Sequence, residues 1–134
     1  MVEPKLVLVA DWVIQDATTR TMSVISIHEQ FYPVGYPLLI PRFIVFSMYQ
    51  RAPEDPAVTQ ATLVIILDNE TLFEKGDVEI NFGAGLTHRS IVRFDGFVLP
   101  HAGNLKVRVT AGDQSIESYT MPAFPVGTPV PQIA

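Results

Sequence analysis

The chain has 134 residues, the size of one domain, and no cysteine, which excludes a disulfide scaffold, a thiolate nucleophile and a thiolate zinc site. Hydrophobic residues make up 48% and charged residues 17%, which is typical of a globular protein and not of a disordered one. The net charge of -5, with the nine basic residues spread from Lys5 to Arg108, argues against a nucleic-acid partner.

The chain also lacks the patterns of exported or membrane-bound proteins. The apolar run near its start follows an acid and ends at Asp11, so it is shorter than the apolar core of a secretory signal. The longest aliphatic run, residues 63–67, is far shorter than the ~20 residues that span a bilayer. We therefore expect a soluble cytoplasmic protein that has no membrane partner.

The first third of the chain predicts a strand followed by a hairpin. Residues 5–10 are apolar and predict a first strand, which Asp11 and Trp12 interrupt. Residues 13–15 and 22–28 flank a polar connection, so they predict the two arms of a hairpin.

The stretch 31–42 combines prolines with aromatic residues. Proline cannot donate a hydrogen bond to a central β-ladder, so the three prolines of this stretch predict a crossing loop or a ragged edge strand. Tyr32 and Tyr36 lie in this loop and are candidate interface residues.

The middle of the chain predicts four further strands. Residues 43–49 and 61–67 are apolar runs of strand length, and the second of them ends in a polar turn. Residues 71–82 are predicted to return antiparallel to it, with a break near their glycine. Residues 88–99 predict another strand, with Gly96 as a bulge or kink.

The most regular alternation of apolar and polar residues begins at residue 105 and predicts a β-hairpin. A two-residue primed turn at residues 112–113 would place Val109 opposite Ile116 and Arg108 opposite Glu117. This register pairs apolar residues on one face and opposite charges on the other.

These elements together predict the fold class. Apolar residues nowhere keep the helical spacing of three and four, and eight or nine short strands predict an all-β, antiparallel two-sheet sandwich of immunoglobulin-like type. Residues 1–124 are expected to form this single domain. The prolines of residues 125–134 predict an extended tail whose last residues are mobile.

Three predicted strands are apolar on both faces, although a sandwich strand needs apolar residues on one face only. These are residues 6–9, 43–46 and 63–67. Loops, the aromatic stretch or the tail of the same chain could cover the outer faces. Alternatively, a protein partner or a second copy of the chain covers them, since large exposed apolar patches usually mark interfaces.

Residues that could carry catalytic or metal chemistry are few. His28, His88 and His101 could in principle hold a zinc ion, but no two of them have ligand spacing on one strand. The acids of residues 68–79 could hold calcium, although charge at a strand edge also prevents aggregation. No nucleophile elbow, phosphate loop or dinucleotide fingerprint occurs, so we expect no cofactor, metal or catalytic residue.

Three stretches are familiar when they are taken together: LVLVADWVIQD at residues 6–16, VISI at 24–27 and FVLPHAG at 97–103. They resemble a family of small uncharacterised bacterial proteins, a domain of unknown function. The resemblance covers nearly the whole chain and implies a single immunoglobulin-like β-sandwich without an established activity. It places Asp11, Trp12 and Asp16 at positions that recur as acid, aromatic and acid, which makes them candidates for folding or binding.

The sequence favours a non-catalytic protein-binding or assembly module that acts through its apolar sheet faces. The candidate interface residues are Asp11, Trp12, Asp16, Tyr32, Tyr36 and His101. The alternatives are a metal-dependent enzyme that uses the three histidines and a structural component of a phage-like assembly.

Overall fold

The structure, a computed structural model, describes residues 1–131, which form strands and turns and contain no helix. In this part of the chain, no helix is long and apolar enough to cross a membrane. The nine strands are β1 (Glu3–Gln15), β2 (Met22–Ile27), β3 (Leu38–Gln50), β4 (Val58–Leu67), β5 (Glu70–Asn81), β6 (Thr87–Leu99), β7 (Gly103–Ala111), β8 (Gln114–Glu117) and β9 (Met121–Ala123).

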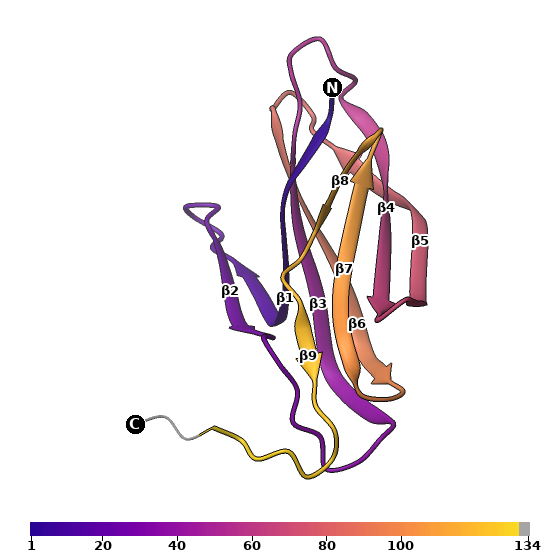
Figure 1. Cartoon of the computed structure of the whole chain (residues 1–134). Helices are drawn as coiled ribbons and strands as arrows, with labels where there is room; N and C mark the ends of the chain where they lie inside the picture. Colours follow the sequence, from indigo (N-terminus) through magenta and orange to yellow (C-terminus); the bar gives the residue numbers. More distant parts are fainter. Residues whose placement is uncertain (132–134) are drawn as a thin grey trace.

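Two antiparallel sheets pack face to face (Figure 1). The first sheet has the strand order β2-β1-β3-β6 and the second has the order β5-β4-β7-β8, with β9 paired to β7. Alternate side chains of the strands other than β2 point between the sheets and form one contiguous core. The predicted all-β, two-sheet sandwich is therefore confirmed.

The β7–β8 hairpin has the predicted register. Val109 lies opposite Ile116, and Arg108 lies opposite Glu117. Gly112 has a φ of 63°, which a primed turn requires and which glycine adopts without strain. The Arg108 guanidinium donates to the Glu117 carboxylate at 3.0 Å, so the cross-strand charge pair that the alternation predicted is formed.

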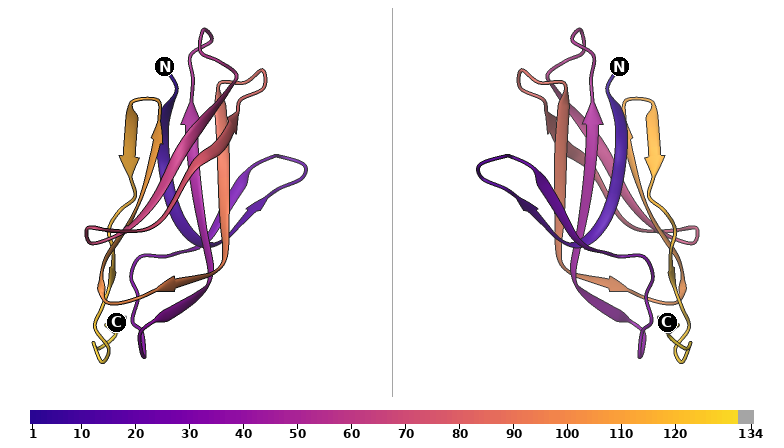
Figure 2. Two further views of the ribbon diagram at one scale, coloured as in Figure 1. Left: turned by 90° about the vertical axis from the view of Figure 1, so that its right-hand side faces the viewer. Right: turned by 90° about the vertical axis from the view of Figure 1, so that its left-hand side faces the viewer.

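The prediction that Asp11 and Trp12 interrupt the first strand is wrong. β1 continues through them and changes partner instead, because its residues up to Ala10 pair with β3 and its residues from Ala10 onward pair with β2. Figure 2 shows that the β1–β2 hairpin stands away from the body of the sandwich. One strand thus belongs both to the sandwich and to a projecting hairpin.

The prediction of a loop or ragged edge up to residue 42 is also wrong in part, because β3 already begins at Leu38. Pro41 lies inside β3 opposite Gly96, and Gly96 forms the predicted kink with a φ of 99°. β1 pairs with β3 only from Ile44 onward, so the missing N–H of Pro41 breaks no hydrogen bond to β1.

The predicted break in β5 is a β-bulge within a continuous strand. Gly76 and Asp77 of β5 together lie opposite the single residue Thr62 of β4, and pairing resumes on both sides. The glycine signal in the sequence therefore marked an irregularity of the ladder and not its end.

The C-terminal segment contains a short strand, which lies within the predicted domain, and a turn in the part predicted as a tail. Residues 121–123 form β9, which pairs with the beginning of β7 in spite of its proline. Residues 125–128 form a turn, closed by the N–H of Thr128, which donates to the carbonyl of Pro125 at 3.2 Å. Residues 132–134 of the predicted tail lie outside the described residues.

The outer face of β3 is covered by the chain's own β1–β2 hairpin. Ile44 and Phe46 are only 2% and 5% exposed, yet they lie outside the inter-sheet core, into which their neighbours Phe43 and Val45 point. Trp12 of the hairpin contributes to this cover, because it packs against arginine side chains of β3 and β6. For β3, the same chain therefore covers the second apolar face.

The outer face of β4 is covered differently. Val64 and Ile66 are half-buried, and the residues that flank them on β5 and β7 include Glu74, Lys106 and Arg108. The aliphatic stems of such long charged side chains cover apolar neighbours while their charges stay in water. No second layer of chain is needed on this face.

Because the two faces of β4 are buried to different extents, alanine substitutions at two neighbouring isoleucines should lower the free energy of unfolding by clearly different amounts. Ile65→Ala should lower the free energy of unfolding by about 2–5 kcal/mol, because it deletes a fully buried side chain between the sheets. Ile66→Ala is the matched control on the half-buried outer face, and it should lower the free energy of unfolding clearly less than Ile65→Ala does. Guanidinium denaturation of both variants measures this, and equal losses would contradict the assignment of inner and outer faces.

Candidate functional site

The six candidate residues predicted from the sequence lie in three separate parts of the fold. Asp11, Trp12 and Asp16 lie on the β1–β2 hairpin, Tyr32 and Tyr36 lie in the loop before β3, and His101 lies in the turn before β7. The structure therefore does not bring them together into one site, and each group has to be considered by itself.

Trp12 packs on the outer face of the first sheet. The guanidinium carbon of Arg93 lies 4.5 Å from the centre of its ring, and that of Arg42 lies 5.2 Å away. Such cation–π contacts contribute about 0.5–2 kcal/mol each, depending on exposure. Trp12 is half-buried and does not belong to the inter-sheet core.

Asp16 builds the turn at the tip of the β1–β2 hairpin. One of its carboxylate oxygens accepts hydrogen bonds from the backbone N–H groups of Thr19 and Thr18, both at 2.8 Å. These bonds favour the charged carboxylate and lower the pKa of Asp16 below its usual value. The contacts of Asp16 thus explain a role in folding. Asp11, the other acid of the hairpin, is half-buried in β1.

The hydrogen bonds of Asp16 predict that the turn at the hairpin tip loses stability in acid. Because folding lowers the pKa of Asp16, its carboxylate contributes stability above the unfolded-state pKa, and this contribution is lost as pH falls through the folded-state value. Asp16→Ala should therefore speed amide exchange of residues 18 and 19 at neutral pH, measured by NMR. Asp11→Ala is the control and should leave this exchange unchanged; an equal effect of both substitutions would contradict the assignment.

Tyr32 and Tyr36 hold the C-terminal segment. The ring of Tyr32 stacks on that of Phe124 with 4.9 Å between the ring centres, and the Tyr36 hydroxyl donates to the Phe124 carbonyl at 2.6 Å. Backbone hydrogen bonds between Phe31 and this segment complete the contact. Both predicted interface tyrosines are therefore engaged within the chain.

His101 links two turns at one end of the sandwich. Its Nδ1 lies 2.8 Å from the carbonyl oxygen of Ala102, and its Nε2 lies 3.3 Å from a carboxylate oxygen of Glu70. The hydrogen bond to the Ala102 carbonyl and that to Glu70 both raise the pKa of His101 above its usual value. Nearby, the carboxylate of Asp68 accepts a hydrogen bond from the N–H of Asn104.

This arrangement predicts the titration of His101. Its pKa should lie above the usual value for histidine, and Glu70→Gln should lower it, whereas Glu74→Gln should not change it. A raised folded-state pKa contributes stability below the unfolded-state pKa, and that contribution is lost as pH rises through the folded-state value. NMR titration of the imidazole protons measures all three proteins, and an unchanged pKa in Glu70→Gln would contradict the contact.

The structure does not bring the three histidines together. His28 lies against the carbonyl of Arg42, His88 lies against the carbonyl of Asn81, and His101 lies beside Glu70. Within residues 1–131, no three histidine or acidic side chains are arranged so that they could hold a metal ion. The hypothesis of a metal centre built from these histidines is therefore wrong.

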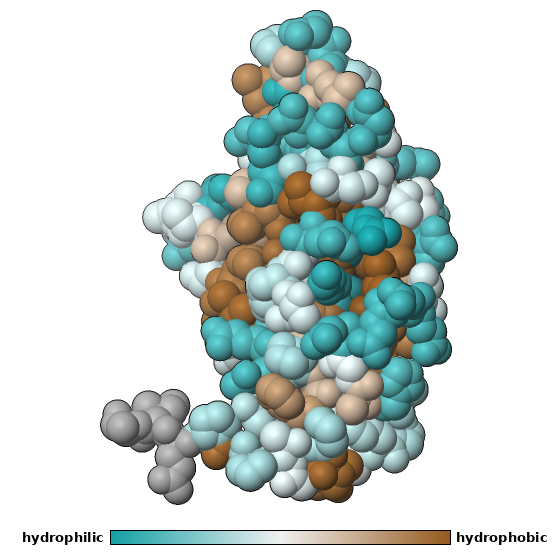
Figure 3. Space-filling view, in the orientation of Figure 1, coloured by the Kyte–Doolittle hydropathy of each residue, from teal (hydrophilic) through white to brown (hydrophobic). Residues whose placement is uncertain are grey.

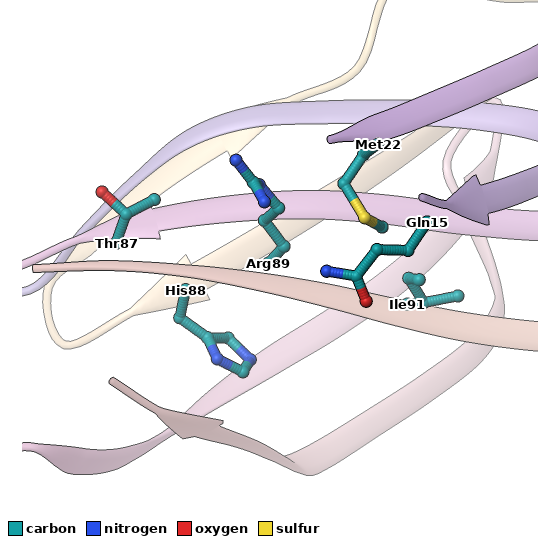
Figure 4. Close-up of a pocket in the computed structure, with 6 residues that line it drawn as sticks. All are labelled: Gln15, Met22, Thr87, His88, Arg89 and Ile91. Carbon is teal, nitrogen blue, oxygen red and sulfur yellow. The ribbon is translucent and has the colours of Figure 1, made fainter. Parts of the chain in front are cut away.

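A groove that the sequence did not predict lies between the β1–β2 hairpin and β6. It has a volume of about 380 Å³. Its lining residues are Gln15 and Met22 of the hairpin and Thr87, His88, Arg89 and Ile91 of β6. Figure 4 shows Gln15 and Met22 extending toward β6, while the His88 ring points to the other side of that strand from Thr87.

One hydrogen bond joins the two walls of this groove. The guanidinium of Arg89 donates to the carbonyl of Arg20 in the hairpin turn at 3.3 Å. Arg89 and Ile91 share a face of β6, because alternate residues of a strand do, but no signal in the sequence places a hairpin beside that face. The groove therefore exists only because the hairpin folds back.

The face of the β1–β2 hairpin that carries Trp12 exposes three isoleucines. Ile14, Ile25 and Ile27 are 45%, 42% and 43% exposed, and the pairing of Trp12 with Ile25 and of Ala10 with Ile27 places them on one face. Figure 3 shows hydrophobic side chains gathered where this hairpin leaves the sandwich. Among the described residues, this face is the clearest candidate for a contact with another molecule.

Models of protein families, curated proteins and solved structures were all compared with the chain, and none of them matches it.

Proposed function

We propose that the protein is a non-catalytic binding or assembly module that engages a protein partner or a second copy of itself through the exposed isoleucines of the β1–β2 hairpin. The observation that carries this proposal is the set of three isoleucines exposed together on a projecting element. Singly exposed apolar residues are ordinary on protein surfaces, but apolar residues that share one face favour an interface.

Two further features support this proposal. β2 lies at the end of its sheet, so within the described residues one of its edges has no strand partner and could accept another strand. Trp12 and its two neighbouring arginines lie at the root of the same hairpin. Tryptophan and arginine are enriched among the residues that dominate binding energies at protein interfaces.

The immunoglobulin-like character of the sandwich belongs to the same proposal. The sets β1-β3-β6 and β4-β7-β8 correspond in order to strands A-B-E and C-F-G of an immunoglobulin domain, and β5 lies beside β4. This order supports kinship with the family of small uncharacterised bacterial sandwich proteins. A cysteine-free composition also supports a cytoplasmic location, where disulfides are rare.

Sedimentation velocity over a range of protein concentrations tests the self-assembly form of this function. The wild-type chain should associate at micromolar concentration, and the pair Ile14→Ser and Ile25→Ser should shift it to the monomer, because polar side chains remove the apolar contact. The control pair is Val34→Ser and Val58→Ser, which removes apolar residues that are 97% and 54% exposed elsewhere. It should leave association unchanged.

Two outcomes would contradict the proposal. A wild-type chain that stays monomeric at every concentration would exclude self-assembly through this face. Equal weakening by the two pairs would show that association depends on general surface hydrophobicity and not on the hairpin.

A further inference from the structure

We infer that the groove between the β1–β2 hairpin and β6 is the docking site for an extended acidic segment of a partner protein. This inference rests on the proposed binding function and names the chemistry of the partner. It concerns a different surface from the isoleucine face, so the two can fail independently.

One arginine lines the groove, and three others lie on the hairpin or on the sheet face beside it. Arg89 lines the groove, Arg93 and Arg42 lie against Trp12, and Arg20 lies in the hairpin turn. The side-chain ion pairs formed by lysine and arginine within residues 1–131 are Lys5–Glu3, Lys75–Asp77 and Arg108–Glu117. Nearly half of the basic residues of an acidic chain thus gather here without a carboxylate within 4 Å.

The acids on the same side of the molecule do not neutralise these arginines. Asp95 lies opposite Arg42 in the β3–β6 ladder, but the two side chains form no ion pair. The carboxylate of Asp16 is occupied by its own turn, and Asp11 is half-buried in β1. Charges elsewhere on the chain are screened over about 8 Å at physiological ionic strength, so the local arginines decide what approaches the groove.

The spacing along β6 defines the shape of the ligand. Arg89, Ile91 and Arg93 point to one face of the strand, because alternate residues share a face. The two arginines are four residues apart, which is about 13 Å at ~3.3 Å per residue. An extended peptide has the same repeat, so the matching pattern is an acid, an apolar residue two positions on and a second acid after two more.

The walls of the groove fit this pattern. Met22 from the hairpin and Ile91 from β6 provide apolar contacts, and Gln15 and Thr87 provide hydrogen-bonding groups. A hollow of about 380 Å³ accommodates a few side chains and not a folded domain. Charges arranged along a line also suit an extended segment better than a single small anion, which needs its donors to converge on one point.

The fluorescence of the single tryptophan can report peptide binding directly. Trp12 is the only tryptophan of the chain, and its ring lies against Arg42 and Arg93. The probe is the capped peptide Ser-Glu-Ser-Leu-Ser-Glu-Ser, and the control peptide has lysine in place of both glutamates. The acidic peptide should change the Trp12 fluorescence saturably and more weakly at high salt, whereas the lysine peptide should not change it.

A matched pair of variants locates the site. Arg89→Glu should weaken peptide binding at least tenfold, whereas Lys106→Glu, the same charge reversal on the outer face of the other sheet, should change it less than twofold. Isothermal calorimetry provides a second readout that does not depend on Trp12, and circular dichroism shows that both variants are folded. Equal weakening by the two variants, or no binding of the acidic peptide at millimolar concentration, would overturn the inference.

The same measurements separate this inference from the proposed function. Peptide binding should persist in the Ile14→Ser and Ile25→Ser pair, because neither isoleucine lines the groove. Association that depends on the isoleucines without any peptide binding would overturn the groove assignment alone. Self-association that Arg89→Glu abolishes would support the groove and assign its acidic segment to a second copy, whose β5 carries Glu70, Leu72 and Glu74 in the required spacing.

Discussion

The change of partner within β1 is the constraint on which the rest of this structure depends. Up to Ala10 the strand is paired with β3, and from this residue onward it is paired with β2. The hairpin that results stands away from the sandwich, and its Trp12 packs beside the outer face of β3. Burial of Ile44 and Phe46 on this face excludes water from apolar surface that the sandwich core cannot reach.

The turns stabilise this arrangement through local hydrogen bonds to charged groups. Asp16 accepts two backbone hydrogen bonds at the hairpin tip, and Asp68 accepts one from the beginning of β7. Charge-assisted bonds of this kind are stronger than neutral ones, so short side chains fix the chain direction where no core exists. Several acids and the histidine that sequence reasoning considered as ligands are therefore part of the framework, which explains why no metal set is formed by the described residues.

The same hairpin produces both surfaces that distinguish this sandwich. Gln15 and Met22 of the hairpin form one wall of the groove, and Ile14, Ile25 and Ile27 are exposed on the face that carries Trp12. An exposed apolar face and a groove lined by Arg89 on one projecting element suit a module that contacts other proteins. Neither surface needs a catalytic group, and both depend on the rigid attachment of β1 to β3.

The sequence by itself determined the elements whose signals are local. Alternation and a glycine turn specified the β7–β8 hairpin to the residue, and the all-β class followed from the same period of two. It did not determine which residues lie outside the core, because a strand that is apolar on both faces does not reveal what covers each face. Trp12 against two arginines, the tyrosines against Phe124 and the groove beside β6 all join residues distant in sequence. Only the tertiary structure decided these contacts, because they depend on the direction in which the hairpin and the C-terminal segment fold back over the sandwich, and no local pattern encodes that direction.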